Sequence, residues 1–249
     1  MPTWIDHGSM TVNNTSKIVI LGGTSGLGLA TARAAALAGA QVFIGSRNPE
    51  SVRRALGELP ESVTGYAVDA ADSANISAFF DLVGEFDHLA YTAAENLAAV
   101  PLSDFTPDKA AAFFGLRLFH ALDAVRLAVP HLRVGGSITL TSGTAAYRGG
   151  PGWLLGSAAS GATISAMRSL AVELAPLRVN AVAPGVVRSP LWNGMSEADR
   201  EAMYAGTAAG LPMGRVGEPE DVAKAFLALM DQDFVTGTVS VVDGGTLIV

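Results

Sequence analysis

A glycine-rich loop is the part of the sequence whose residue types and spacing point most directly to chemistry. Directly after a short apolar run, the chain reads Gly22-Gly23-Thr24-Ser25-Gly26-Leu27-Gly28. Glycines let the backbone turn tightly and approach a phosphate where a side chain would block it. A helix that begins at this loop would add free N–H groups and the positive end of its dipole. The pattern therefore predicts a pyrophosphate site, with a plain strand-to-helix turn as the alternative.

The end of the next apolar run indicates which dinucleotide would bind. That run ends at Ile44-Gly45-Ser46-Arg47. Dinucleotide-binding folds that use NAD place a carboxylate near here, on the ribose 2′-hydroxyl. A hydroxyl and a guanidinium suit a 2′-phosphate instead, because both donate hydrogen bonds and the guanidinium is charged. We therefore expect NADP(H) rather than NAD(H), unless Arg47 is only an exposed loop residue.

These residues need elements that bring them to one edge of a sheet. Strand-like runs lie at 17–21, 41–46, 63–69, 88–92, 137–141, 178–183 and 239–242. Helix-like stretches lie between them at 26–38, 75–83, 103–129, 157–175 and 219–230, and a polar loop is expected over 189–211. This alternation indicates βαβ units, and the continuous apolar strands indicate a sheet buried on both faces. The prediction is an α/β fold, a Rossmann-like doubly wound parallel seven-stranded sheet with helices on both faces.

The length of the chain and the regular alternation of strands and helices indicate one domain over residues 17–249. The segment 1–16 has no period and contains His7-Gly8-Ser9-Met10, so we expect it to be disordered or a cloning remnant. No uninterrupted apolar run reaches the roughly 18 residues of a membrane span, and no signal peptide is predicted.

Composition narrows the class of function. The chain has no Cys, which excludes a disulfide framework, a thiolate metal site and a Cys nucleophile, and suits a reducing cytoplasm. The formal net charge of -7 argues against a nucleic-acid partner. We therefore expect a cytoplasmic protein that acts on a small molecule, with no metal.

Motifs spread from Lys17 to Gly245 resemble those of the short-chain dehydrogenase/reductase family. The spacing Gly22-xxx-Gly26-x-Gly28 is similar to that family's loop. Further matches follow in chain order: Asp69 and Ala70 where the family binds adenine, Tyr91-Thr92-Ala93-Ala94 at a strand end, Pro184-Gly185-Val186-Val187 and Ser189 beside the nicotinamide, Arg215–Ala223 before the last helix, and Gly237 with Val242-Asp243-Gly244-Gly245. The resemblance implies hydride transfer between NADP(H) and a carbonyl or alcohol.

The family's catalytic residues are largely missing. The resemblance implies a Ser at a strand end, a Tyr and a Lys four residues apart on one helix, and an Asn in the long fourth helix. Ser142 matches the Ser, but Gly156 falls at the Tyr position and Ser160 at the Lys position. None of the four Tyr has a Lys four residues later, and no Asn lies between Asn96 and Asn180.

Two interpretations stay open. In the first, the chain is an atypical oxidoreductase in which Ser142 holds the substrate oxygen. The missing acid is replaced by Tyr147, which lies beside Arg148, by a water chain or by the substrate itself. The alternative for Tyr147 is an aromatic residue that only lines the cleft. In the second, the chain is a non-catalytic nucleotide-binding or scaffolding subunit, since a positioned acid typically contributes about 10²–10⁴ in rate.

The resemblance also bears on the ligand and on subunit pairing. Several large side chains indicate an apolar substrate: Trp153, Trp192, Met195, Met203 and Tyr204. The Ala-rich stretches Leu116–Val129 and Ser157–Ala175 lie where this family pairs subunits, so a homodimer or homotetramer is expected.

Overall fold

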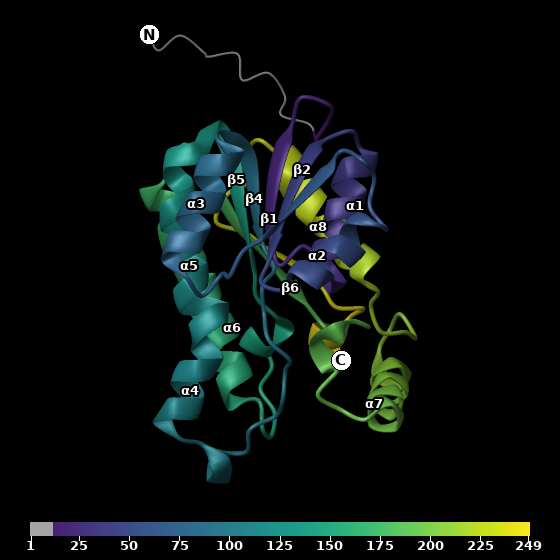
Figure 1. The fold of residues 1–249 in the computed structure, drawn as a ribbon. Helices are drawn as coiled ribbons and strands as arrows, with labels where there is room; N and C mark the ends of the chain where they lie inside the picture. Colours follow the sequence, from purple (N-terminus) through teal and green to yellow (C-terminus); the bar gives the residue numbers. More distant parts are fainter. Residues whose placement is uncertain (1–11) are drawn as a thin grey trace.

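Seven parallel strands form one sheet in the order β3-β2-β1-β4-β5-β6-β7, in a computed structural model that describes residues 12–249 (Figure 1). The strands are β1 Lys17–Leu21, β2 Gln41–Ser46, β3 Val63–Ala67, β4 Phe86–Tyr91, β5 Leu132–Thr141, β6 Arg178–Pro184 and β7 Val239–Val242. The predicted fold class is confirmed. The strand order reverses between β1 and β4, which is where open α/β sheets bind ligands beyond the carboxyl ends of the strands.

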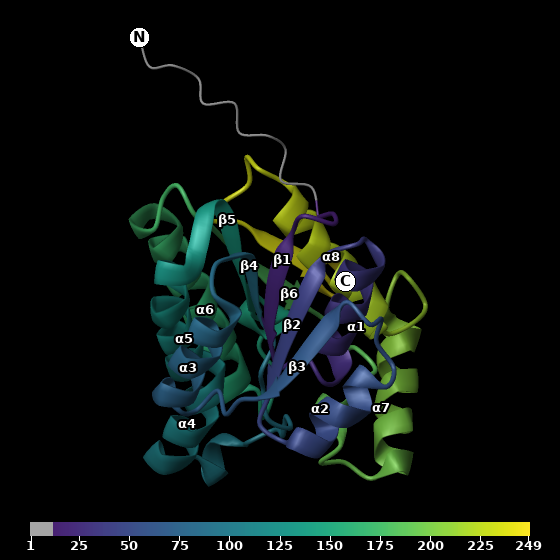
Figure 2. The ribbon, with the colours of Figure 1, turned by 45° about the horizontal axis from the view of Figure 1, so that its top comes forward.

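Helices cover both faces of the sheet (Figures 1 and 2). One face carries α1 Gly26–Leu37, α2 Pro49–Leu56 and α8 Pro219–Asp231. The other carries α3 Ser73–Val83, α5 His120–Ala128 and α6 Leu154–Glu173. Two further helices, α4 Pro107–Phe114 and α7 Glu197–Gly210, extend past the carboxyl ends of the strands (Figure 1). They therefore border the region where the predicted site residues meet.

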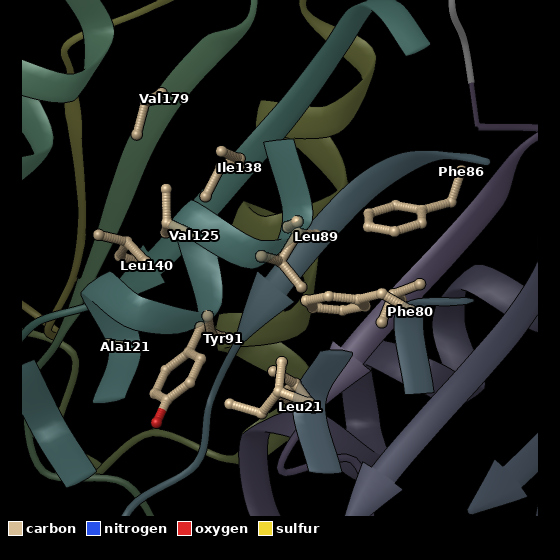
Figure 3. Close-up of a cluster of buried hydrophobic side chains, with 14 of the residues drawn as sticks. Leu21, Phe80, Phe86, Leu89, Tyr91, Ala121, Val125, Ile138, Leu140 and Val179 are labelled. Carbon is tan, nitrogen blue, oxygen red and sulfur yellow. The ribbon is translucent and has the colours of Figure 1, made fainter. Parts of the chain in front are cut away.

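A dense apolar cluster holds the α3, α5 and α6 face to the sheet (Figure 3). Phe80, Phe86, Leu89 and Ile138 are fully buried in it. Tyr91 lies at the edge of the cluster, with its hydroxyl directed away from the other labelled side chains. This core fixes the end of β4, from which the chain continues into the site.

Two helices were not expected from the sequence. The stretch 189–211 is not a loop: α7 occupies its second half, and Ser196 caps it by accepting a hydrogen bond from the Asp199 N–H at 3.2 Å. Likewise Asn48 caps α2, accepting from the Glu50 N–H at 2.8 Å. α2 is only 8 residues long and the α7 segment is rich in Ala and polar residues, so periodicity alone missed both, although Asn48 and Ser196 are typical capping residues.

The expected helix over 103–129 is divided in the structure. It consists of α4, a π-helical turn at Gly115–Phe119, and α5. π-Helical turns inside longer helices frequently occur at functional sites. Residues 1–11 of the expected N-terminal segment lie outside the described residues. Val12 is already buried against the core, and its N–H donates to Asp231 Oδ1 at 2.5 Å.

His88 is a polar residue inside the sheet, with no exposed surface. Its Nδ1 lies 2.9 Å from Ser137 Oγ, and its Nε2 has no hydrogen-bond partner within the described chain. Burial, together with the nearby Arg178 charge, lowers the pKa of His88 to about 4.

We predict that the free energy of unfolding falls as the pH drops from about 6.5 to about 4. Across this window the unfolded His88 binds a proton that the native, neutral ring does not, which costs up to about 3 kcal/mol. Urea titrations of the wild type and His88→Gln at pH 7 and pH 4.5 measure this. The variant should lose this part of the pH dependence, and an identical dependence in both proteins would contradict the assignment.

Candidate active site

The glycine loop lies against the end of β4. A Cβ atom on Gly28 would come within 2.3 Å of Gly22 O and 2.4 Å of Thr92 Oγ1. A Cβ on Gly22 would lie 2.6 Å from Ala93 N, and Gly22 has a φ of +91°. The glycines predicted to form a phosphate loop are therefore required by the packing of the turn itself.

The N-terminus of α1 is free to bind an anion. Its first turn contains no acidic residue, and the Ser25 side chain at the N-cap makes no capping hydrogen bond. The first N–H groups of the helix thus keep their hydrogen-bonding capacity, and the dipole adds positive potential. Uncapped N–H groups beside a glycine turn fit the phosphates of a dinucleotide.

The residues predicted to select the dinucleotide lie at the ends of β2 and β3. Thr24 Oγ1 donates to Ser46 Oγ at 2.9 Å. Arg47 is exposed and makes no ion pair with another described residue. Asp69 accepts a hydrogen bond from the Ala71 N–H at 2.9 Å, and Ala70 is buried. The arrangement leaves the Arg47 guanidinium available to an added phosphate.

A cavity of about 820 Å³ lies beyond the carboxyl ends of the central strands. The predicted cofactor residues that line it are Leu27, Ala93, Ala94, Pro184, Gly185, Val187 and Ser189. The other predicted cofactor residues do not line it: Gly22, Thr24, Ser25, Gly26, Gly28, Ser46, Arg47, Asp69 and Ala70. The two groups adjoin, because a Cβ on Gly26 would lie 3.4 Å from Ser189 Cβ.

Ser142 lines this cavity directly after β5. Its N–H donates to Val182 O at 2.8 Å, and its Oγ donates to the Ser160 carbonyl at 3.0 Å. Gly156 and Ser160, the two α6 residues where the family resemblance implies Tyr and Lys, also line the cavity. The structure therefore brings together the three positions, with Ser142 alone carrying the implied side chain.

Aromatic and aliphatic side chains form much of the cavity wall. Trp153 and Trp192 meet edge to face, with ring centroids 6.1 Å apart and planes at 79°. Trp192 Nε1 donates to Val187 O at 2.9 Å, which fixes the indole, and Met203 completes this side. Met195 and Tyr204, also predicted to cover the ligand, pack beside this wall and do not line the cavity.

Few ionisable side chains line the cavity. Among the described residues these are Tyr91, Arg117 and Arg148. The Tyr91 hydroxyl donates to Leu116 O at 2.8 Å, and burial raises its pKa above the ordinary tyrosine value. Tyr147 lies outside the lining and is 49% exposed. The described lining thus offers no side chain suited to exchange a proton near neutral pH.

Arg117 is a cavity residue that the sequence reasoning missed. It lies in the π-helical turn, and its Nη2 donates to Glu95 O at 2.5 Å. Its Cζ lies 4.3 Å from the centroid of the Phe113 ring. Burial lowers the pKa of Arg117, and the Glu95 charge opposes that effect. The available signal was a single charge within the apolar stretch Phe113–Phe119.

Comparison with known proteins settles the family. Residues 22–246 match the family model described as Enoyl-(Acyl carrier protein) reductase. The chain is 30% identical to the short-chain dehydrogenase/reductase MalC of Malbranchea aurantiaca, over 93% of this chain and 94% of the relative. The chain belongs to the short-chain dehydrogenase/reductase family. The relatives carry that name, so the protein is placed among oxidoreductases of this type.

Solved structures of the family agree with this fold. The structure of the MalC reductase/Diels-Alderase superposes with a TM-score of 0.89 at 29% identity, covering 97% of this chain and all of that one (100%). A small-chain dehydrogenase in complex with NADPH gives 0.83 at 34% identity, covering 94% and 99%. An NADPH-bound short-chain oxidoreductase from Pseudomonas aeruginosa PAO1, described as containing an atypical catalytic center, gives 0.87 at 28% identity, covering 94% and 97%.

Neither a membrane-spanning helix nor a metal-binding cluster occurs among the described residues. Within residues 12–249, no helix is both long and apolar enough to cross a membrane. In the same residues, no cluster of three or more His, Asp or Glu side chains could hold a metal ion.

We predict that Gly28→Ala lowers the free energy of unfolding by about 1–3 kcal/mol, because the added methyl group overlaps Gly22 O and Thr92 Oγ1. Gly161→Ala is the matched control, since a Cβ there meets no atom within 4 Å inside α6. The control should gain about 0.5–1 kcal/mol from helix propensity. Chemical denaturation measures both, and equal effects in the two variants would contradict the close packing of the loop.

Proposed function

We propose that this chain binds NADP(H) and transfers hydride between it and the carbonyl or alcohol carbon of an apolar small molecule. The observation that carries the proposal is the shared cavity. It is lined by Ala93, Ala94 and Pro184–Val187, the segments expected beside a nicotinamide, and by Ser142. NADPH is bound in two solved relatives of 28% and 34% identity, which supports the choice of cofactor.

Each part of the proposed cofactor would meet a distinct group of this chain. The glycine loop and the first N–H groups of α1 would hold the pyrophosphate. Ser46 and Arg47 would hold the 2′-phosphate, and Asp69 would lie beside the adenine. When bound, the cofactor supplies or accepts the hydride.

The substrate would lie between Ser142 and the Trp153–Trp192 wall. The Ser142 hydroxyl would turn from the Ser160 carbonyl to donate to the substrate oxygen. The wall would hold an apolar ring system, since two indoles and Met203 present large apolar surfaces. As the family resemblance implies, two copies would pair through α5 and α6. Phe119, directly before α5, is 55% exposed, and Val172 in α6 is 81% exposed, so both could contact a second copy.

A second candidate function is a nucleotide-binding subunit with little redox turnover. The cavity lining favours it, because the described part of that lining holds no Asp, Glu, His or Lys side chain. Tyr91 is unsuited as an acid, since its hydroxyl is engaged with Leu116 O and its pKa is raised. Measured hydride transfer from NADPH to any carbonyl compound would decide against this alternative.

We predict that Arg47→Ala weakens NADP⁺ binding about tenfold, because it removes a charge-assisted hydrogen bond to the 2′-phosphate at an exposed site. NAD⁺ has no such phosphate, so its affinity should not change. Isothermal titration calorimetry measures both. The control is Arg54→Ala, which removes the same charge from an exposed side chain of α2. It should leave both affinities unchanged. A parallel loss for both dinucleotides in Arg47→Ala would count against the assignment.

We predict that Gly156→Tyr combined with Ser160→Lys raises carbonyl reduction about 10²–10⁴-fold, by supplying a positioned acid and a nearby cation. A Cβ on Gly156 lies 3.3 Å from Trp153 Cε3, so the substitution requires the indole to move. The assay follows NADPH absorbance with 9,10-phenanthrenequinone, an apolar aromatic dicarbonyl. Gly156→Phe combined with Ser160→Lys adds the same bulk without a hydroxyl and should gain nothing. Equal rates in the two double variants would refute the implied positions.

A further inference from the structure

The charged side chains that line the cavity are all positive. They are Arg117 and Arg148, and no Asp or Glu side chain of a described residue lines it. Arg117 is only partly exposed, and it makes no ion pair with any residue of the described chain. The Glu95 charge offsets part of the cost of burying this guanidinium, but no carboxylate of a described residue lies within ion-pair distance, so a bound anion would stabilise it further. The cavity is therefore complementary to an anion.

Arg117 is held in place by contacts that use only part of its hydrogen-bonding capacity. Nη2 donates to the carbonyl oxygens of Glu95 and Asn96, at 2.5 and 3.5 Å, and the guanidinium lies over the Phe113 ring. Nη1 and Nε have no hydrogen-bond partner among residues 12–249. A fixed guanidinium with unused N–H groups is suited to bind a carboxylate or a similar oxyanion.

The backbone that carries Arg117 is also fixed. The Tyr91 hydroxyl donates to Leu116 O, inside the π-helical turn, at 2.8 Å. Thr141 Oγ1 in turn donates to Tyr91 O at 2.7 Å, which ties this turn to the end of β5 beside Ser142. Arg117 and Ser142 are therefore anchored to the same strand ends.

Arg148 is a weaker candidate for the same task. It is exposed, and its Nη1 donates to Thr246 O at 2.7 Å and to Val249 O at 2.6 Å. These two bonds fasten the segment that follows β7 to the loop after β5. The geometry gives Arg148 a structural role at the edge of the cavity.

We propose that Arg117 is the oxyanion-binding residue of this cavity and that its ligand is an apolar ring compound bearing one carboxylate, phenolate or enolate oxygen. The inference rests on the proposed function for the use of the cavity as a substrate site, and it names the substrate class. Because a guanidinium does not give up a proton, Arg117 stabilises negative charge on the ligand and does not replace the missing acid.

Isothermal titration calorimetry with 2-naphthoate and 2-naphthamide tests this without any turnover. The two probes share one ring system, and only the first carries a negative charge. The wild type should bind naphthoate more tightly than naphthamide. Arg117→Gln should weaken naphthoate about 10- to 100-fold, the range for losing hydrogen bonds to a charged group, and leave naphthamide unchanged.

Two further variants test whether the effect depends on the negative charge of naphthoate and on Arg117 itself. Arg117→Lys should regain part of the naphthoate affinity, because it keeps the charge without the planar fork. Arg148→Gln should leave naphthoate binding within about twofold of the wild type, since its bonds are to the backbone. If Arg117→Gln weakens both probes equally, Arg117 only holds the 95–96 loop and the inference is overturned. Failure of the wild type to bind naphthoate also overturns it.

The cofactor is the other source of oxyanions, through its phosphates. NADP⁺ affinity in Arg117→Gln should equal that of the wild type. A loss confined to NADP⁺ would assign Arg117 to the cofactor and overturn the inference. Absence of NADPH oxidation would count against the proposed function only, because the naphthoate result does not depend on it.

Discussion

The close approach of the β1–α1 turn to the end of β4 is the constraint on which the site depends. Gly22, Gly28 and Ala93 meet at distances that leave no room for a Cβ on either glycine. Thr92 Oγ1 donates to Leu21 O and Gly22 O at 3.0 and 3.2 Å, which holds the two strand ends together. This contact places the free N–H groups of α1 beside the cavity.

In the proposed function, dinucleotide binding and chemistry would depend on two different kinds of group. Phosphate binding would rely on backbone N–H groups and on glycines, and this part of the site matches what the family resemblance implies. Chemistry would rely on side chains that line the cavity, and there Gly156 and Ser160 stand where the resemblance implies Tyr and Lys. The proposed cofactor groove and the proposed chemistry therefore depend on different atoms.

The sequence predicted the sheet and the glycine loop because both depend on local patterns. β1 and β2 appear as largely apolar runs, and Gly22, Gly26 and Gly28 follow β1 closely. Arg117 could not be predicted as a site residue in the same way. Its place in the cavity depends on Tyr91 and Thr141 fixing a π-helical turn, and these residues are distant in sequence. Tyr147 shows the converse, since it is near Ser142 in sequence but lies outside the cavity lining.

The most direct test of the account is energy transfer from tryptophan to NADPH in the wild type. Trp153 and Trp192 line the cavity, so NADPH bound with its nicotinamide beside Pro184 and Gly185 should quench their emission and gain emission of its own. The account predicts a saturable, single-site titration, with NADH requiring a higher concentration. The absence of saturable transfer with either cofactor would contradict it, and the glycine loop would then be only a structural turn.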